Sequence, residues 1–195
     1  ARTERELLVL LPKPLDRRGE RRRSPLLEAA YLARRLAEAG LKGLVFAGAR
    51  KSAELIARYA AHPLVRPYRA GYTARERRRL EADLKEGRVR VLVSTSALEL
   101  GVDIGELDAV VLVGYPGSTA AFWQRAGRAG RGERRALLVY IPREDPMDEY
   151  FLHRPALLLE SPPEEAVADP QNPVLCPLHL HAAAREKPLL AEELL

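Results

Sequence analysis

The amino-acid sequence predicts an α/β domain in which a mostly parallel sheet of about six strands is flanked by helices on both faces. Short apolar runs alternate with segments of helical pattern at intervals of roughly 20–25 residues, which is typical of parallel βα units. The runs are almost continuously apolar, as expected of strands that are covered on both faces. Capping residues and glycines mark where several of the helices begin and end.

The first strand is predicted at residues 7–11, an apolar run that two prolines terminate. A charged loop follows at residues 16–23. Ser24 can then cap a helix whose first position suits Pro25, and Gly40 ends this helix. The second strand is predicted at residues 43–47.

The third strand and its flanking helices continue the same alternation of strand and helix. A helix is predicted from about residue 50 to residue 60, and a strand at residues 65–69. Thr73 and Glu76 form a capping box, in which each side chain satisfies an exposed backbone donor of the other residue. The helix that this box begins is expected to reach about Lys85.

The remaining predicted strands occupy residues 89–93, 107–113 and 136–141, with a helix from Ser118 to about residue 126. Beyond residue 141 the pattern weakens, and two proline-rich stretches have the composition of linkers. We therefore expect one domain at residues 1–160, and a linker with the start of a following domain at residues 161–195. A short helix is expected to begin in that second part at Leu178.

The charge of +5 is unevenly distributed along the 195 residues. Residues 1–90 carry 23 Lys/Arg against 11 Asp/Glu, a net charge of +12, whereas the remainder is acidic. The basic half is suited to a polyanion, although a solvated charged face is the commoner meaning of such a bias. No apolar run approaches the roughly 18 residues of a membrane span, so we expect no membrane partner. The single Cys176 fits a reducing cytoplasm, where a DNA-bound protein would be nucleoid-associated.

The most informative segment is QRAGRAGRG at residues 124–132, because three arginines recur at three-residue spacing with small residues between them. Positions three apart lie on one face of a helical turn. Arginines directed outward from such a turn can hold a triphosphate and stabilise the charge that develops during its cleavage. Two glycines here weaken a helix, which is understandable if another surface approaches the backbone closely. The alternative is a solvated basic end of a helix.

A second segment, STSALELGVDI at residues 94–104, follows the fourth predicted strand. Hydroxyl groups at the end of a strand, beside free backbone N–H groups, are suited to binding a phosphate. The alternative is that Ser94, Thr95 or Ser96 simply caps a helix.

Together these two segments resemble motifs VI and V of superfamily 2 helicases, motif VI being usually written Q-R-x-G-R-x-G-R. Residues 44–52 resemble motif IV, and residues 68–72 resemble the phosphate-contacting motif that follows it. The resemblance covers about residues 5–145 and implies the second RecA-like motor domain of such a helicase. The variant ALELGVDI, with residues 172–184, resembles a bacterial and fungal group of DNA-repair helicases linked to interstrand crosslinks.

The resemblance implies a role for particular residues. Arg128 and Arg131 would be arginine fingers on the γ-phosphate of ATP, and Gln124 would lie at the nucleotide or the attacking water. Arg125 would be partly structural on the nucleotide side, and Gly101 and Asp103 would approach the ribose or couple the nucleotide to DNA. The residues implied to touch phosphates of single-stranded or partly duplex DNA are Thr95, Arg50, Lys51, Ser52, Arg69, Gly71 and Tyr72. Movement from 3′ to 5′ is implied.

The sequence contains neither a G-x-x-x-x-G-K-[S/T] loop nor an acidic box for Mg²⁺. Gly43 and Gly48 have the right separation, but Lys51 comes two residues too late. We therefore expect ATP and Mg²⁺ to be held mainly by a first RecA-like domain of the same polypeptide. The isolated chain is expected to be inactive as an ATP hydrolase, although it would be part of an enzyme.

Two other classes of function stay open at this point. One is a nucleic-acid-binding or protein-docking module without motor action, and the other is an RNA-remodelling ATPase. Motifs V and VI do not distinguish DNA from RNA. The sequence Cys176-Pro-Leu-His179-Leu-His181 lacks the second ligand pair of a closed zinc site, so no metal site is predicted. Trp123 is expected to be a packing anchor rather than a stacking platform for bases.

Overall fold

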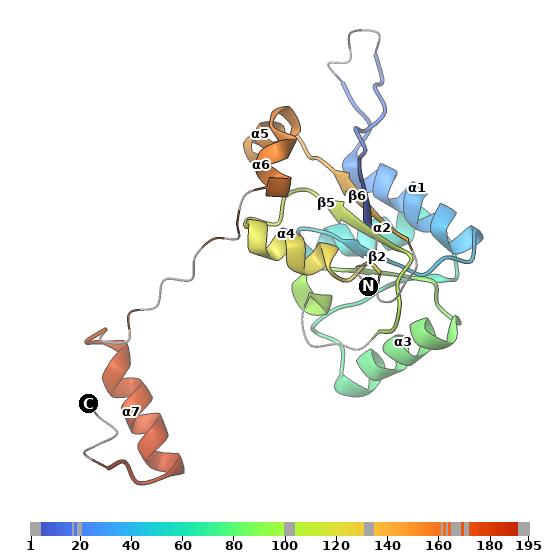
Figure 1. Cartoon of the computed structure of the whole chain (residues 1–195). Helices are drawn as coiled ribbons and strands as arrows, with labels where there is room; N and C mark the ends of the chain where they lie inside the picture. Colours follow the sequence, from blue (N-terminus) through green and yellow to red (C-terminus); the bar gives the residue numbers. More distant parts are fainter. Residues whose placement is uncertain are drawn as a thin grey trace. The chain divides into compact units, whose positions relative to one another are not determined.

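The computed structural model describes residues 5–16, 18, 21–99, 104–130, 135–160, 162, 164, 169 and 172–190. The chain divides into two compact units, Ala1–Pro163 and Glu164–Leu195, and each is described by itself. Figure 1 shows the first unit as a central sheet with helices on its faces, and the second as a single helix with short flanking segments. Among the described residues, no helix is long and apolar enough to cross a membrane.

The first unit is built on a parallel sheet of six strands, as the sequence predicts. Its spatial order is β1-β6-β5-β2-β4-β3, and every neighbouring pair is parallel. The strands are β1 (Arg5–Val9), β2 (Gly43–Phe46), β3 (Val65–Pro67), β4 (Val91–Ser94), β5 (Ala109–Val113) and β6 (Ala136–Ile141). Because all strands are parallel, their carboxyl ends share one edge of the sheet, where ligands bind in folds of this kind.

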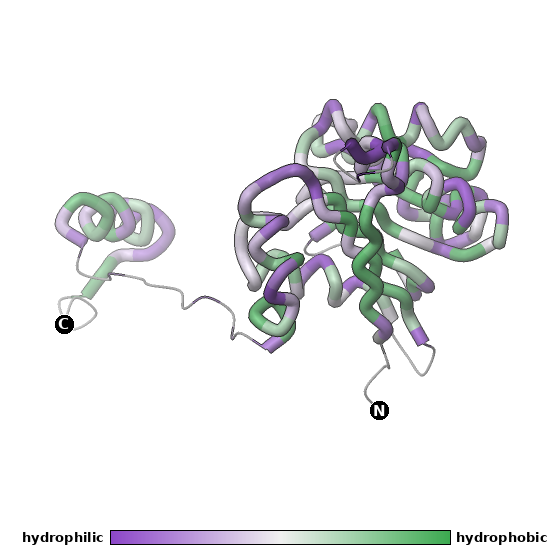
Figure 2. The backbone as a smooth tube through the Cα atoms, turned by 90° about the horizontal axis from the view of Figure 1, so that it is seen from above, coloured by the Kyte–Doolittle hydropathy of each residue, from purple (hydrophilic) through white to green (hydrophobic). Residues whose placement is uncertain are grey.

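Helices cover both faces of the sheet, because successive side chains of each strand point to opposite sides. The helices of the first unit are α1 (Pro25–Glu38), α2 (Arg50–Ala60), α3 (Ala74–Glu86), the 3₁₀ turn η1 (Ser96–Leu98), α4 (Thr119–Ala126), α5 (Pro146–His153) and α6 (Pro155–Glu160). One core packs α1 and α2 against Val45, Val93 and Val111. The other packs α3 to α6 against residues such as Leu44 and Leu112. Figure 2 shows hydrophobic strands through the centre of this unit, between helices that are partly hydrophilic.

The predicted capping residues begin the helices where expected. The Ser24 side chain accepts a hydrogen bond from the Leu26 N–H, and Pro25 occupies the first helical position. The capping box of Thr73 and Glu76 is present in both directions. These local signals are reliable because each satisfies backbone donors that the helix itself leaves without a partner.

Several details differ from the prediction, beginning with β1, which spans Arg5–Val9 rather than residues 7–11. The fourth strand ends at Ser94, one residue later than expected, and the loop at residues 16–23 lies next to an antiparallel bridge between Pro14 and Arg22. Helices α5 and α6 were not predicted, because eight and six residues are too few to show a helical period. Asp145 is nevertheless a clear local signal, since its side chain accepts from the Met147 N–H and Pro146 follows it.

The second unit contains helix α7 (Leu175–Glu186), which begins three residues before the predicted start at Leu178. The Asn172 side chain accepts hydrogen bonds from the N–H groups of Val174 and Leu175. No residue of α7 is buried. A helix in which Leu175 and Leu178 are exposed has no apolar core of its own in the described part of this unit.

Candidate functional site

The carboxyl edge of the sheet contains a cavity of about 260 Å³, formed where β2, β4 and β5 end. Segments from both predicted motifs meet there, together with the loop after β5. The lining residues are Ala47, Gly48, Thr95, Ser96, Val113, Gly114, Tyr115, Pro116, Gly117, Arg125 and Arg143. We call this the strand-end cavity. Two of its lining residues are arginines and none is acidic, which is suited to an anion.

A second hollow of about 230 Å³ lies beside α2 and is lined by Arg50, Glu54, Arg69, Gly71 and Tyr72. Four of these five residues are ones that the sequence assigns to nucleic-acid phosphates. Arg69 Nη1 donates to Glu54 Oε1 at 2.6 Å, and the Arg69 guanidinium lies 4.7 Å from the centre of the Tyr72 ring. The structure therefore brings residues from two separate motifs into one basic and aromatic groove, which we call the α2 groove.

The start of α2 contributes backbone donors near both hollows. Ala49 occupies the N-cap position and provides no side-chain cap. The first N–H groups of such a helix carry partial positive charge and are suited to a phosphate. Lys51 is exposed, and Ser52 is half-buried in the same first turn. Thr95 lies in the strand-end cavity rather than in the α2 groove.

Arg125 and Arg128 of the QRAGRAGRG segment both contact one residue of the other motif. Arg125 Nε donates to Glu99 Oε2 at 2.9 Å, and only 12% and 14% of these two side chains are exposed. Arg128 donates from Nε and from Nη2 to the Glu99 backbone carbonyl oxygen, at 2.9 and 2.7 Å. Glu99 thus joins the segment after β4 to the end of α4 through both its side chain and its backbone.

This arrangement differs from the outward-pointing arginines that the spacing suggested. Arg128 is 8% exposed, and Arg125 lies with its guanidinium 5.6 Å from the centre of the Phe46 ring. A solvated basic end of a helix therefore does not describe these two residues. Both side chains turn inward because the Glu99 carboxylate and carbonyl are within reach as acceptors. Gln124, by contrast, is exposed on α4.

Gly127 and Gly130 each have a local explanation, and the predicted approach by another surface stays a prediction. A Cβ at Gly127 would lie 3.0 Å from the Trp123 carbonyl oxygen, which belongs to the preceding helical turn. Gly130 has φ +70°, a conformation that favours glycine, and its N–H donates to the Leu107 carbonyl at 3.1 Å. Trp123 packs on the core edge-to-face with Phe122, as expected of a packing anchor.

Three residues of the predicted site, Gly101, Asp103 and Arg131, lie outside the described residues. Their assignments to the nucleotide side stay predictions. The described part of the site therefore consists of the strand-end cavity, the α2 groove and the Glu99 contacts of Arg125 and Arg128.

A polar network at the strand-end cavity was missed by the sequence interpretation. Asp148 is fully buried in α5 and accepts hydrogen bonds from the Tyr115 N–H at 2.7 Å and from the Tyr140 hydroxyl. Arg143 Nε donates to its other oxygen at 3.2 Å. Burial, followed by the Asp148 carboxylate, raises the pKa of Tyr140. The glycine-rich turn Gly114-Tyr-Pro-Gly was the one sequence signal for this network. Nothing in the sequence connects that turn to Asp148.

Comparison with known proteins agrees with this geometry. The family model of the helicase conserved C-terminal domain matches residues 26–133. The uncharacterized ATP-dependent helicase YprA of Bacillus subtilis is 38% identical over 192 residues, which is 94% of this chain and 25% of YprA. The ATP-dependent helicase hrq1 of Schizosaccharomyces pombe is 37% identical over 86% of this chain and 17% of its own length.

A solved structure shows the same arrangement of elements. The DUF1998 helicase MrfA, bound to DNA and AMPPNP, is 36% identical and superimposes with a TM-score of 0.82 over 97% of this chain and 27% of that one. The chain therefore spans about a quarter or less of the length of the curated relatives described above. One of these relatives is bacterial and the other fungal, as the motif variant implied.

Proposed function

We propose that this chain works within an ATP-dependent DNA helicase or translocase. The chain belongs to the helicase conserved C-terminal domain family and is a second motor domain. In such a protein ATP and Mg²⁺ would be held mainly by a first RecA-like domain. This chain would supply arginines to the nucleotide and hold single-stranded or partly duplex DNA. A location in the cytoplasm, with the nucleoid, belongs to the same proposal.

On the nucleotide side, Arg128 and Arg131 are the proposed fingers, with Gln124 nearby. The Arg128 guanidinium donates two hydrogen bonds to the Glu99 carbonyl oxygen, which order it for a contact with phosphate. An approaching γ-phosphate would gain a planar fork of donors that is already ordered. Arg125 stays on the Glu99 carboxylate and keeps the segment in place, which supports its partly structural assignment.

On the DNA side, the α2 groove offers Arg50 and Arg69, together with the Tyr72 ring. Guanidinium groups contact phosphates without reading the bases, and an aromatic ring can pack on a sugar or a base. Thr95 supplies a hydroxyl at the neighbouring strand end. This set of groups supports sequence-independent binding, which a motor that moves along a strand requires.

The observation that carries the proposal is that Glu99 connects the proposed DNA-binding segment to the proposed nucleotide-binding arginines. It lies four residues after Thr95 on the DNA side, and it accepts hydrogen bonds from Arg125 and Arg128 on the nucleotide side. A displacement of Arg128 by nucleotide would therefore act directly on the segment that carries Thr95. A binding or docking module without motor action has no need of this connection. DNA is favoured over RNA because the MrfA structure contains DNA.

The test is made in a polypeptide that joins this chain to its first motor domain. Arg128→Ala, and separately Arg131→Ala, should abolish DNA-stimulated ATP hydrolysis, with a loss on the order of 10³–10⁵ in rate. ATP affinity should change little, because a group that acts mainly in the transition state affects turnover more than binding. Lys at position 128 should rescue poorly, since a point charge does not reproduce a planar fork.

Arg34→Ala is the matched control for these variants, because it removes an arginine whose ion pair with Glu38 is exposed on α1. It should keep normal turnover. Near-normal turnover in both the Arg128 and the Arg131 variants would refute the proposed fingers.

A further inference from the structure

We propose that the strand-end cavity binds one backbone phosphate of single-stranded nucleic acid, and that Arg143 is the residue that holds this phosphate. The inference rests on the proposed function and adds a contact that no motif assigns. Arg143 follows β6, far in sequence from the residues predicted to contact DNA. It nevertheless lines the same cavity as Thr95 and Gly48.

The Arg143 side chain is held in one orientation by a buried carboxylate. Its Nε donates to Asp148 Oδ2 at 3.2 Å, while 42% of the side chain stays exposed. Asp148 is itself fixed, because Oδ1 accepts from the Tyr115 N–H and from the Tyr140 hydroxyl. Arg143 Nη2 also lies 3.9 Å from Asp145 Oδ2, an exposed carboxylate that a phosphate would have to displace before both Nη groups could make the planar, two-pronged contact that phosphates favour.

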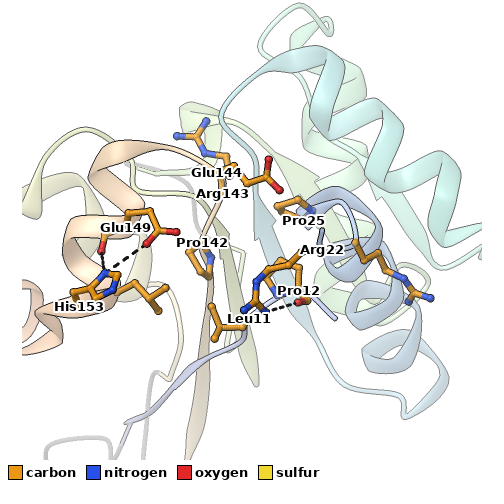
Figure 3. A pocket seen from close by; sticks show the side chains of 11 residues that line it. Leu11, Pro12, Arg22, Pro25, Pro142, Arg143, Glu144, Glu149 and His153 are labelled. Carbon is orange, nitrogen blue, oxygen red and sulfur yellow. Dashed lines mark hydrogen bonds and ion pairs between the residues drawn. The ribbon is translucent and has the colours of Figure 1, made fainter. Parts of the chain in front are cut away.

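Two glycines make room for this guanidinium. A Cβ at Gly114, which has φ +81°, would lie 2.0 Å from Arg143 Nε, and a Cβ at Gly48 would lie 3.3 Å from Nη1. Arg143 therefore lies directly over the backbone at the ends of β5 and β2. In Figure 3, its guanidinium points away from Leu11 and Pro12, which line the neighbouring hollow of about 250 Å³. Arg143 borders both hollows, and its guanidinium is directed away from the Leu11 and Pro12 side of the second one.

The groups around the cavity favour an anion. Arg125 is also held by its Nε, on the Glu99 carboxylate, and neither Glu99 nor Asp148 lines the cavity. Thr95 and Ser96 add hydroxyl donors at the end of β4. The uncapped start of α2 adds backbone partial charge, since Gly48 lies directly before its N-cap residue.

A strand phosphate fits this position better than a nucleotide does. The cavity adjoins the start of α2, whose first residue, Arg50, lines the α2 groove, so a strand in that groove can continue past Gly48. The segment with the proposed fingers instead reaches the amino edge of the sheet. There the Gly130 N–H donates to the carbonyl of Leu107, two residues before β5. Arg125, near the end of α4, also lines the cavity, so the preference for a strand phosphate rests on the continuity of the cavity with the α2 groove.

The experiment measures binding of a fluorescein-labelled oligothymidylate to the 195-residue chain by anisotropy, at several KCl concentrations. Each phosphate contact in a single strand contributes about −0.7 to the log–log salt slope. Arg143→Ala should make the slope shallower by about 0.7 and weaken binding by about tenfold, as expected for one lost charge-assisted hydrogen-bonded contact. Arg143→Lys should keep most of the slope, because the charge remains.

Arg88→Ala is the matched control. Arg88 also donates from Nε to an aspartate five residues away, Asp83, at 2.7 Å, but it lies before β4 at the amino edge of the sheet. Its loss should leave the slope at the wild-type value. Thermal unfolding of every variant separates folding from binding. A lower melting temperature for Arg143→Ala with an unchanged slope would show a purely structural role and overturn the inference.

The remaining outcomes distinguish the two proposals. If the wild-type chain binds the oligonucleotide but Arg143→Ala behaves like Arg88→Ala, the Arg143 site is wrong and the proposed function stands. If the wild-type chain shows no salt-sensitive binding, the Arg143 site and the DNA-binding part of the proposed function are both wrong. If Arg143→Ala weakens binding of a fluorescent ATP analogue and not of the oligonucleotide, the cavity takes a nucleotide phosphate and the inference is overturned.

Discussion

The guanidinium of Arg128 donates two hydrogen bonds to the backbone carbonyl oxygen of Glu99, at 2.9 and 2.7 Å. These two bonds order the Arg128 side chain, which is only 8% exposed. The Glu99 carboxylate is left for Arg125. Arg125 and Arg128 therefore use different groups of the same residue, and each can be altered without removing the acceptor of the other.

The ion pair of Arg125 with Glu99 should contribute more to stability than the pairs on the surface. Arg125→Ala leaves a largely buried carboxylate without its partner and should lower the free energy of unfolding by about 1–3 kcal/mol. Arg34→Ala removes an exposed pair with Glu38 and should lower the free energy of unfolding much less, because water screens that pair. Urea unfolding of both variants gives the comparison. Equal effects would show that the Glu99 contact is not a stabilising one.

The isolated chain should fold and show negligible ATP hydrolysis, with or without DNA. The reason is that its sequence has neither a phosphate loop nor an acidic box for Mg²⁺. Phosphate release by the purified chain, measured beside its Arg128→Ala variant, provides the check. A substantial rate that this substitution removes would mean that the chain binds and cleaves ATP without a first motor domain.

Binding of the isolated chain to single-stranded DNA should be weak and strongly sensitive to salt. The α2 groove holds Arg50 and Arg69, so replacing both with Ala should make the log–log salt slope shallower by about 1.4, two phosphate contacts at about 0.7 each. Arg58→Ala, on the last turn of the same helix, is the control. A slope that the double variant does not alter would place the strand on another surface.

Stability at alkaline pH should depend on Tyr68. Burial, followed by the hydrogen bond to Glu81 at 2.7 Å, raises the pKa of Tyr68 to about 12. In the unfolded chain this hydroxyl ionises near its ordinary value of about 10. The stabilisation is therefore complete below about pH 10 and is lost as the pH rises toward 12.

Tyr68→Phe should flatten this part of the stability profile, without removing the contribution of Tyr140, whose pKa is also raised. Urea midpoints of the wild type and the variant between pH 9 and about 11.5 measure the difference. Parallel profiles would contradict the assignment. Tyr59, which is exposed, provides the control substitution Tyr59→Phe.

The fold could be predicted from the sequence because its signals are local. The strands are apolar runs, and Ser24 and Thr73 cap the helices that follow them. The segments of the candidate site could be located for the same reason, since each follows a strand whose end defines the edge of the sheet. The inward orientation of Arg125 and Arg128 could not be predicted, because spacing gives a face of a helix and not the acceptor that the face meets.

The contact between Arg143 and Asp148 is a second feature that could not be predicted from the sequence. An aspartate in a short helix is expected at the surface. Only the packing of α5 against β6 reveals that Asp148 is fully buried. Its hydrogen bond to the Tyr115 N–H joins residues 33 positions apart. Such a network depends on tertiary geometry, which neither hydrophobic periodicity nor capping residues encode.

The faces of α1 and α2 that pack on the sheet are built largely of alanine. Ala29, Ala33 and Ala37 of α1, with Ala53 and Ala60 of α2, are at most 3% exposed. Side chains of one carbon let helix backbones approach each other and the strands closely, and they have no rotamers through which the packing could adjust. This half of the domain should therefore move as a rigid body. Work done at the nucleotide would then move the whole domain relative to a neighbour, rather than bend the domain internally.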